Sequence, residues 1–395
     1  MITLKDVQDA QRNIAPYIHK TPLILSNSLS LLSGAEVHCK LENLQKTGSF
    51  KVRGAFNIMT RITSERVVAA SMGNHAQAVA FAAQKLGKKA KIVMPLTAPI
   101  VKEEATKGYG AEVVLTGERF SDAFSYARAQ SDFTFIHPFD DDYVIAGQGT
   151  VGIEVLEDLQ DIDAVLVPVG GGGLIAGIAT AIKALSPRTA VIGVQTEAAA
   201  SACVSFRERK LVEQQPRATI ADGIAIGSLG DRTYEIIRSR VDAMLQVCED
   251  SIARAILLLL ERKKLVVEGA GAVPLAALLE HAEQFKGKRV VLVLSGGNID
   301  FALIDRIIRK GLVTSHRIGV LEVVIDDSAG SLHALMGIVA SHRANVLDIA
   351  HDRLSAGLAF GKARVVITAE VRNRDHLEHL IRELGERGYA VSLRA

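Results

Sequence analysis

The sequence has little of what marks several classes of protein. Its three cysteines, Cys39, Cys203 and Cys248, are far apart and lack paired spacing, which argues against a disulfide framework and a zinc motif. The 46 Lys and Arg residues nearly balance 44 Asp and Glu residues, so the net charge of +2 indicates no nucleic-acid or membrane-surface role. No apolar run approaches the roughly 20 residues of a membrane span, and the first residues lack a signal pattern. We therefore expect a cytoplasmic protein without a metal centre.

The composition is that of a globular protein with more than one domain. The chain has 395 residues, of which 48% are hydrophobic and 23% charged, so two or three domains are expected. Short Val, Ile and Leu runs alternate with helical patterns over most of the length. The predicted strands of this kind lie at 66–70, 90–94, 111–115, 164–168, 190–194 and 289–294. Such runs between helices predict parallel sheets in doubly wound α/β layers.

The pattern changes after residue 312. From Arg317 apolar and polar residues alternate, and a turn follows at 326–331. The remaining periodicities predict a helix at 332–342, strands at 344–350 and 358–368, a helix at 375–386 and a strand at 390–393. The order β-α-β-β-α-β is that of the ferredoxin-like unit, which predicts a separate small domain.

Lys51 is the first candidate for chemistry. It lies among small residues in the segment Thr47-Gly48-Ser49-Phe50-Lys51-Val52-Arg53. An amine attacks a carbonyl only in its neutral form, and a dry pocket or the nearby Arg53 would lower its pKa in the required direction. Taken alone, the segment is more typical of a solvated lysine on the first turn of a helix, because lysines are mostly solvated.

Two further segments lie where a strand passes into a helix. Residues 71–77 offer backbone N–H groups and the Ser71 and Asn74 side chains to an anion. Residues 170–173 are four glycines, which let the backbone close around a phosphate. The same glycines fit a dinucleotide fingerprint, with Glu197 near the expected acidic position, so a nicotinamide oxidoreductase stays open here.

A fourth segment, Ser295-Gly296-Gly297-Asn298, follows an apolar strand. Ligands of open α/β sheets gather at the carboxyl ends of strands. A small hydroxyl at that place suits a hydrogen bond to a ring nitrogen, although a plain turn is the better explanation of the segment when it is considered alone.

Together with 145–150, these segments occur in the order found in the fold-type II pyridoxal-phosphate enzymes, and the chain resembles the threonine dehydratases (threonine ammonia-lyases) among them. The resemblance implies two doubly wound parallel-sheet domains like those of the tryptophan synthase β chain. It implies a catalytic domain at 1–315, with a small subdomain at about 46–147 inserted in the large one. The terminal unit, 316–395, resembles an ACT domain, a ferredoxin-like regulatory module that binds amino acids.

The resemblance also implies roles for single residues, with Lys51 as the catalytic lysine that carries pyridoxal 5'-phosphate. The other implied cofactor contacts are Phe50, Asn74, Gly170, Gly171, Gly172, Gly173, Leu174 and Ser295. Those implied for the substrate carboxylate are Ser71, Gly73, Asn74 and His75. Those implied for an amino-acid effector are Asp326, Asp327, Gly330, Ser331 and Leu332.

The implied reaction is deamination of L-threonine, and of L-serine, by β-elimination in a homodimer or homotetramer. Met72 stands where relatives carry a small residue, and it offers no acid or base to the second face of the substrate, which argues against a serine racemase. Cys203 stands where an aspartate of a divalent-metal site is expected, beyond Glu197, which argues against metal dependence and a 3-hydroxyaspartate dehydratase. A purely oligomerising terminal unit and a non-catalytic amino-acid sensor are the remaining alternatives.

Overall fold

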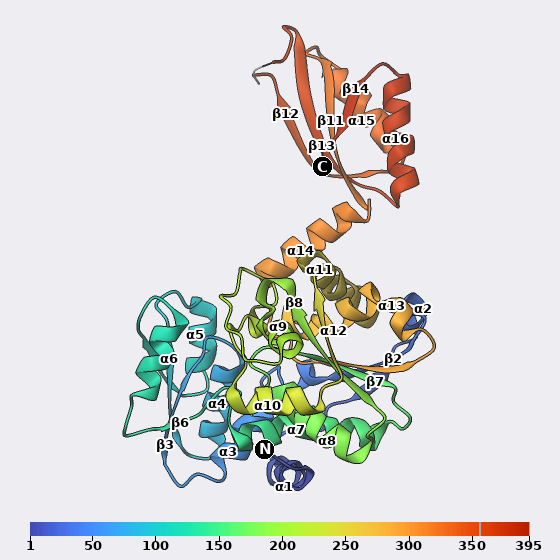
Figure 1. Cartoon of the computed structure of the whole chain (residues 1–395). Helices are drawn as coiled ribbons and strands as arrows, with labels where there is room; N and C mark the ends of the chain where they lie inside the picture. The colour runs from blue at the N-terminus through green and yellow to red at the C-terminus, as the bar shows by residue number, and fades with distance from the viewer. Residues whose placement is uncertain (355–356, 395) are drawn as a thin grey trace. The chain divides into compact units, whose positions relative to one another are not determined.

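Two sheets organise the first unit of the chain, Met1–Asp300. The computed structural model describes residues 1–354 and 357–394. The large sheet has the strand order β1-β2-β10-β7-β8-β9, and the small sheet the order β5-β4-β3-β6 (Figure 1). β1 and β2 pair antiparallel, whereas the pairings from β2 through β10 and β7 to β9, and those of the small sheet, are parallel. The expectation of doubly wound parallel sheets is confirmed.

The predicted strands of this unit all form, within a residue or two of their expected ends. The large sheet contains β1 (Leu23–Leu25), β2 (Glu36–Leu41), β7 (Ala164–Pro168), β8 (Ala190–Thr196), β9 (Ala243–Val247) and β10 (Arg289–Leu294). The small sheet contains β3 (Arg66–Ala70), β4 (Lys89–Met94), β5 (Glu112–Leu115) and β6 (Thr134–Phe135). The pattern analysis missed β1, β2, β6 and β9. β1 and β6 are only three and two residues long, and β2 carries a charged residue in a buried position.

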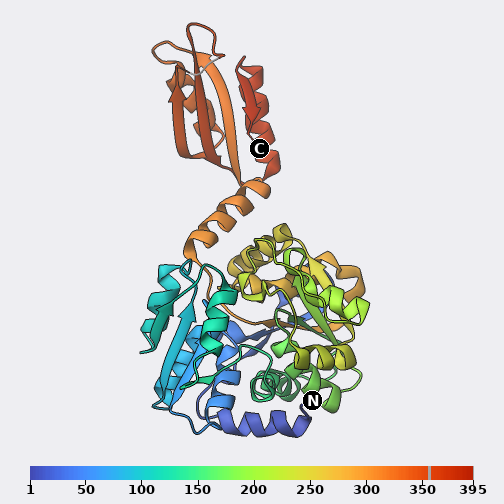
Figure 2. The same ribbon diagram turned by 60° about the vertical axis from the view of Figure 1, so that its left-hand side comes forward.

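Helices cover both sheets and connect their strands (Figures 1 and 2). Those of the first unit are α1 (Leu4–Ile14), α2 (Asn27–Ser33), α3 (Lys51–Met59), α4 (Asn74–Lys85), α5 (Ile100–Lys107), α6 (Phe120–Arg128), α7 (Asp142–Asp158), α8 (Gly173–Leu185), α9 (Ser201–Glu208), α10 (Asp231–Arg240), α11 (Glu249–Leu258), α12 (Gly269–Glu280) and α13 (Ala282–Phe285). There are also three short turns of helix. η1 (Glu42–Leu44) follows β2, η2 (Glu197–Ala199) follows β8, and η3 (Asp222–Ile224) precedes α10.

The two faces of the small sheet bury alternate residues of one strand. Val67 and Ala69 of β3 pack with α3 and α4, whereas Val68 and Ala70 pack against α6. Successive side chains of a strand point to opposite faces, so a continuous apolar run is what a sheet covered on both sides requires. This packing places the carboxyl end of β3, and the start of α4, at one edge of the small sheet.

Glycines allow α7 to approach two other helices closely. A Cβ at Gly147 of α7 would lie 2.7 Å from the Cα of Gly54 in α3. A Cβ at Gly177 of α8 would lie 2.3 Å from the Ile145 carbonyl oxygen and 2.5 Å from the Gly149 nitrogen. Because backbone atoms cannot yield as a flexible side chain does, these contacts require glycine. α3, which begins at Lys51, is thereby held directly against α7.

The second unit, Phe301–Ala395, begins with α14 (Phe301–Thr314). It continues with β11 (Ile318–Asp326), α15 (Ser331–Ser341), β12 (Asn345–Asp352), β13 (Lys362–Glu370), α16 (Arg374–Glu386) and β14 (Ala390–Leu393). The sheet order β12-β13-β11-β14, with antiparallel pairings, is that of a ferredoxin-like unit. α15 and α16 share one hydrophobic cluster on one face of the sheet (Figure 2). The predicted β-α-β-β-α-β order is confirmed.

We expect Gly177→Ala to destabilise the first unit, because its methyl group has no space between the backbones of α7 and α8. Overpacking of a core costs about 1–3 kcal/mol. Gly108→Ala is the matched control, since its Cβ would lie 3.4 Å from the Ala105 and Glu104 carbonyl oxygens, an ordinary contact. Urea unfolding followed by circular dichroism measures both. Equal midpoints for the two variants would contradict the close packing.

Candidate active site

Backbone pairing joins the Lys51 segment to the turn after β10. The amide of Phe50 donates to the Ser295 carbonyl over 3.1 Å, and the amide of Gly297 donates to the Gly48 carbonyl over 2.8 Å. Ser49 and Gly296 form an isolated β-bridge between the same two stretches. Residues nearly 250 positions apart in the sequence thus become neighbours, and the predicted lysine and the predicted ring-nitrogen serine belong to one site.

Lys51 begins α3 and its amine is desolvated. Nζ donates to the Pro138 carbonyl over 2.8 Å, and burial lowers the pKa of Lys51 to about 8. The carboxylate of Glu268 acts in the opposite sense and raises it. An amine with such a pKa is partly neutral near pH 7.5, which a nucleophile or a general base requires.

The expected contribution of Arg53 to this shift is wrong. The Arg53 guanidinium is fully buried and engages Glu42 and Glu154, with oxygen distances of 2.6–2.9 Å. Its charge is neutralised there, and the pKa of Lys51 responds to burial and to Glu268 instead. Neighbours in sequence on a helix point in different directions, so adjacency was a poor guide to electrostatic contact.

A chain of polar side chains fixes the orientation of Asn74. Nδ2 of Asn298 donates to the Thr47 carbonyl over 2.8 Å and to Oδ1 of Asn74 over 2.7 Å. Nδ2 of Asn74 then donates to Oε1 of Glu268 over 2.8 Å. One N–H of Asn74 remains for another acceptor, which suits the predicted contact to a ring oxygen.

Glu268 is a site residue that the sequence analysis missed. It is 4% exposed and lies at the amino end of α12, in the stretch Val266-Val267-Glu268-Gly269-Ala270. Burial and the charge of Asp222 raise the pKa of Glu268 to about 7, against a lowering by the Asn74 hydrogen bond. A lone carboxylate within small and apolar residues was the available signal. A titratable group beside both Lys51 and Asn74 can tune the charge of the site.

The loop from β3 to α4 forms the first of two anion cradles. Ser71 Oγ accepts from the Gly73 amide over 3.1 Å, and a Cβ at Gly73 would meet no atom within 4 Å, so the space beside it is open. In the part of the chain that the structure describes, the Asn74 and His75 amides donate to no protein group. Such N–H groups at a helix start bind carboxylates.

His75 is a structural member of this loop. Its side chain is 4% exposed, and Nε2 lies 3.0 Å from the Ile136 carbonyl oxygen. Burial, reinforced by the charge of Lys51, lowers the pKa of His75 to about 3, so the ring is neutral near pH 7. A neutral ring bound to a carbonyl fixes the loop, and the substrate contact predicted for His75 stays a prediction.

The glycine loop between β7 and α8 forms the second cradle. Among residues 1–354 and 357–394, no protein group accepts from the amides of Gly171, Gly172, Gly173 or Leu174, although all four residues are buried. Gly172 has φ 92° and its Cβ would lie 2.9 Å from Thr233, so this turn requires glycine. Buried N–H groups almost always have a partner, which points to an anionic ligand such as a phosphate.

Hydroxyl groups complete a donor set that pyridoxal phosphate fits. Oγ1 of Thr47 and Oγ of Ser49 are buried without a hydrogen-bond partner in the described chain. The hydroxyl of Ser295, 2% exposed after β10, likewise has none within those residues. Two anion cradles, unpaired hydroxyls and a desolvated lysine match a ligand with a phosphate, a polar ring and an aldehyde.

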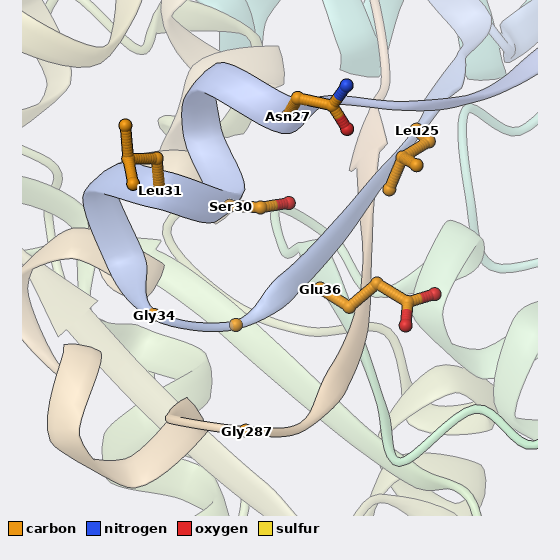
Figure 3. A pocket seen from close by; sticks show the side chains of 8 residues that line it. Leu25, Asn27, Ser30, Leu31, Gly34, Glu36 and Gly287 are labelled. Carbon is orange, nitrogen blue, oxygen red and sulfur yellow. The ribbon is translucent and has the colours of Figure 1, made fainter.

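Two surface hollows of about 550 Å³ lie elsewhere on the first unit. The one in Figure 3 is lined by Leu25 of β1, Leu31 of α2 and Gly287 among others. The second is lined by residues of α9 and α10 and the turn after α9. The candidate site is therefore defined by its chemistry and not by the size of a hollow.

Cys203, named above for a metal site, is buried in α9, where its Sγ donates to the Leu245 carbonyl over 3.5 Å.

We expect Glu268→Gln to lower the pKa of Lys51 further, because it removes the carboxylate that raises it. Protein freed of ligand would be mixed with pyridoxal phosphate, the aldehyde that the resemblance implies. The rate of imine formation would be followed by absorbance at a series of pH values. The wild-type rate should rise with pH and reach a plateau above about pH 8. The rate of Glu268→Gln should reach its plateau at a lower pH. Glu280→Gln, at the other end of α12, is the control; if both variants keep the wild-type midpoint, Glu268 does not act on Lys51.

Comparison with known proteins places these features in a family. Residues 14–296 match the family model described as pyridoxal-phosphate dependent enzyme. The chain is 47% identical over 400 residues to an L-threonine ammonia-lyase of Thermotoga maritima, covering 100% of both. A crystal structure of a threonine deaminase from T.th. has 48% identity and a TM-score of 0.73, covering 76% of this chain and 99% of that one. A maize serine racemase structure has 35% identity and a TM-score of 0.74, covering 80% and 99%.

The match to the ammonia-lyase covers the whole chain and therefore includes every segment assembled above, which favours the pyridoxal-phosphate interpretation of the glycine loop over the nicotinamide alternative. The amino-terminal strands, the lysine segment, both cradles and nearly all of the turn after β10 lie within the matched residues. The chain belongs to the pyridoxal-phosphate dependent enzymes of fold type II.

Proposed function

We propose that this enzyme deaminates L-threonine, and L-serine, by β-elimination, giving 2-oxobutanoate or pyruvate and ammonia. The observation that carries the proposal is the 47% identity to an L-threonine ammonia-lyase along the entire length of both chains. The site agrees with it, because it offers one desolvated amine and two separate anion cradles.

Each residue has a definite task in the proposed mechanism. Gly170 to Gly173 and Leu174 would bind the cofactor phosphate, Asn74 would donate to the ring oxygen, and the hydroxyl of Ser295 would serve the ring nitrogen. When bound, pyridoxal phosphate supplies a ring that accepts the electrons left at the substrate α-carbon. Ser71, Gly73 and the amino end of α4 hold the substrate carboxylate. Phe50 flanks the lysine: Nζ of Lys51 lies 5.3 Å from the centre of the Phe50 ring.

Proton transfer falls to Lys51. Its amine, which burial keeps partly neutral, takes the α-proton. A serine hydroxyl at the ring nitrogen cannot hold that nitrogen protonated as a carboxylate would. Bound beside this hydroxyl, the cofactor would supply chemistry suited to quick loss of the β-hydroxyl rather than to transamination. The departing hydroxyl leaves as water with the proton that Lys51 took, and the released enamine is hydrolysed by water to the 2-oxo acid and ammonia.

We expect Lys51→Ala to lose the absorbance band of the lysine-linked cofactor and to lower kcat on L-threonine by at least about 10³-fold, because one amine serves as covalent link and base. Lys46→Ala, an exposed lysine five residues earlier, should retain both. The measurement is 2-oxo acid and ammonia release from a panel of β-hydroxy amino acids. Wild-type protein that binds no pyridoxal phosphate would contradict the proposal.

A serine racemase is the second candidate, because a maize serine racemase shares the fold at 35% identity. Met72 argues against it: the side chain is partly buried against the hydrophobic cluster of the small sheet and carries no proton to exchange. Chiral analysis of the serine left after reaction distinguishes the two. D-serine formed faster than pyruvate would favour the racemase.

We propose further that residues 1–315 form the catalytic domain, with 46–147 as its small subdomain, and 316–395 an ACT-like regulatory domain. In support, β3 to β6 form a sheet of their own while β1 and β2 pair with the later strands. We also propose a cytoplasmic homodimer or homotetramer. Within the described chain, no helix is long and apolar enough to cross a membrane.

The proposed effector site is the turn between β11 and α15. Asp326 and Asp327 pair with Lys362 and Arg353 over 2.6 and 2.8 Å, so both charges that a zwitterionic amino acid needs are at hand. Gly330 has φ 94° and open space beside it, Ser331 begins α15, and Leu332 packs against the domain core. These features support an amino acid bound at an interface between two such units.

We expect deletion from Arg317 onward to leave activity on threonine but abolish its response to amino-acid effectors. The threonine deaminase of known structure that covers 76% of this chain supports independent folding of the first unit. Initial rates would be measured with and without each amino acid, branched-chain ones included. If activity and response both survive the deletion unchanged, the terminal unit is not regulatory.

A further inference from the structure

Four charged side chains form a buried cluster that includes Arg53, two residues after Lys51. We call Lys40, Glu42, Arg53 and Glu154 the buried charge cluster. The exposed fractions of Lys40, Glu42 and Arg53 are 0% and that of Glu154 is 4%. Lys40 comes from β2, Glu42 from η1, Arg53 from α3 and Glu154 from α7. The cluster therefore connects a strand of the large sheet with the helix that begins at Lys51.

Every N–H of the Arg53 guanidinium donates a hydrogen bond. Nε and Nη2 donate to the two oxygens of Glu42, each over 2.7 Å. Nη1 and Nη2 donate to the two oxygens of Glu154 over 2.6 and 2.9 Å, and Nη1 also donates to Oγ1 of Thr150 over 3.1 Å. Two bidentate pairs of this kind fix both the position and the plane of the guanidinium.

The remaining members complete the cluster. Nζ of Lys40 donates to Glu154 and to the Thr21 carbonyl, each over 2.6 Å, and the Thr21 hydroxyl donates to Glu42. Two cations face two anions, so the cluster has no net charge. The guanidinium and Lys40 hold the pKa of Glu42 below its usual value although burial alone would raise it.

Stability alone is a poor reason for such a cluster. Desolvation of buried ions often exceeds their attraction, and apolar replacements of the same volume can be neutral or stabilising. What the cluster supplies is geometry, because a planar five-donor group accepts one arrangement of its partners. Two other bonds act in the same direction: the Gly54 amide donates to Gln148 over 3.2 Å, and Asn57 donates to the Tyr143 carbonyl over 2.7 Å.

Arg53 lies two residues after Lys51, in the first turn of the same helix. That turn is held on one side by the cluster and on the other by the pairing of Ser49 with Gly296. Lys51 has four rotatable side-chain bonds, so the direction of its amine depends on where its backbone is fixed. A misplacement of about 1 Å at a reacting group can cost about 100-fold in rate.

We propose that Arg53 is a positioning residue for Lys51, which acts through the fixed geometry of its contacts with Glu42, Glu154 and Thr150 and not through its charge. The inference rests on the role of Lys51 in the proposed function. Its chemistry is local: the first turn of α3 is pinned, and Nζ is thereby presented to the aldehyde carbon of pyridoxal phosphate and to the α-proton of the substrate.

Arg53→Lys tests geometry against charge, because it keeps the charge and offers three donors instead of five. Thr150→Val is the milder variant, which removes one acceptor of Arg53 and leaves all four charges. Arg61→Lys, just after the other end of α3, is the matched control. For each, protein freed of cofactor is mixed with pyridoxal phosphate, and the rate of imine formation at Lys51, with loss of water, is followed by absorbance against pH.

For Arg53→Lys we expect that rate and kcat on threonine, per cofactor-loaded site, to fall about 10- to 100-fold. KM should stay within about twofold, and the pH midpoint of the Lys51 reaction should stay at the wild-type value. Thr150→Val should show the same pattern with a smaller drop. Arg61→Lys should change neither the rate of imine formation nor kcat. Thermal unfolding of every variant separates these effects from lost stability.

Three outcomes would overturn the inference. A shifted pH midpoint in Arg53→Lys or Thr150→Val would mean that charge is what matters. Wild-type rates per loaded site, with only a lower unfolding temperature, would mean that the cluster is merely structural. If Arg53→Lys does not fold, wild-type rates in Thr150→Val decide against the proposal. Failure of wild-type protein to form the imine would instead reject the proposed function.

Discussion

The pairing of the lysine segment with the turn after β10 is the constraint on which the site depends. Two backbone hydrogen bonds and a β-bridge bring Gly48 to Phe50 against Ser295 to Gly297. The loop before α3 and the end of a central strand of the large sheet are thereby made one structure. The amine, the unpaired hydroxyls and the Asn74 side chain then converge because each lies one or two residues from that contact or is hydrogen-bonded to it.

Charge is distributed around this contact in two different ways. Around Arg53, four buried charges are paired with one another, and Thr21 and Thr150 complete their hydrogen bonds. Within the site, Lys51 and Glu268 are left without a strong ionic partner, so burial moves the pKa of each toward neutrality, to about 8 and about 7. The buried charge cluster is fully paired and holds its geometry, whereas Lys51 and Glu268 can still exchange protons. A catalytic site needs both properties.

Some of this could be predicted from sequence and some could not. The apolar runs of β3, β4, β7 and β10 are continuous because both faces of those strands are covered, so their pattern was sufficient. β2 was missed because its Lys40 is charged, and that charge is tolerated only through contacts with Glu154 and Thr21, which lie outside the strand. Glu268 was missed because its one local signal, a lone carboxylate within small and apolar residues, is shared with helix-capping acids; its importance comes from Asn74, 194 residues away.

The sequence by itself determined most strands of the first unit and its α/β class, the ferredoxin-like order of the second unit and the segments that carry chemistry, because periodicity and glycine placement are local properties. Only the tertiary structure decided what those segments do to one another. It showed that Arg53 serves the helix and not the amine, and that His75 is held neutral. It brought in a carboxylate that no motif contained. Burial and hydrogen-bond partners set pKa values and orientations, and both are properties of contacts between residues far apart in the chain.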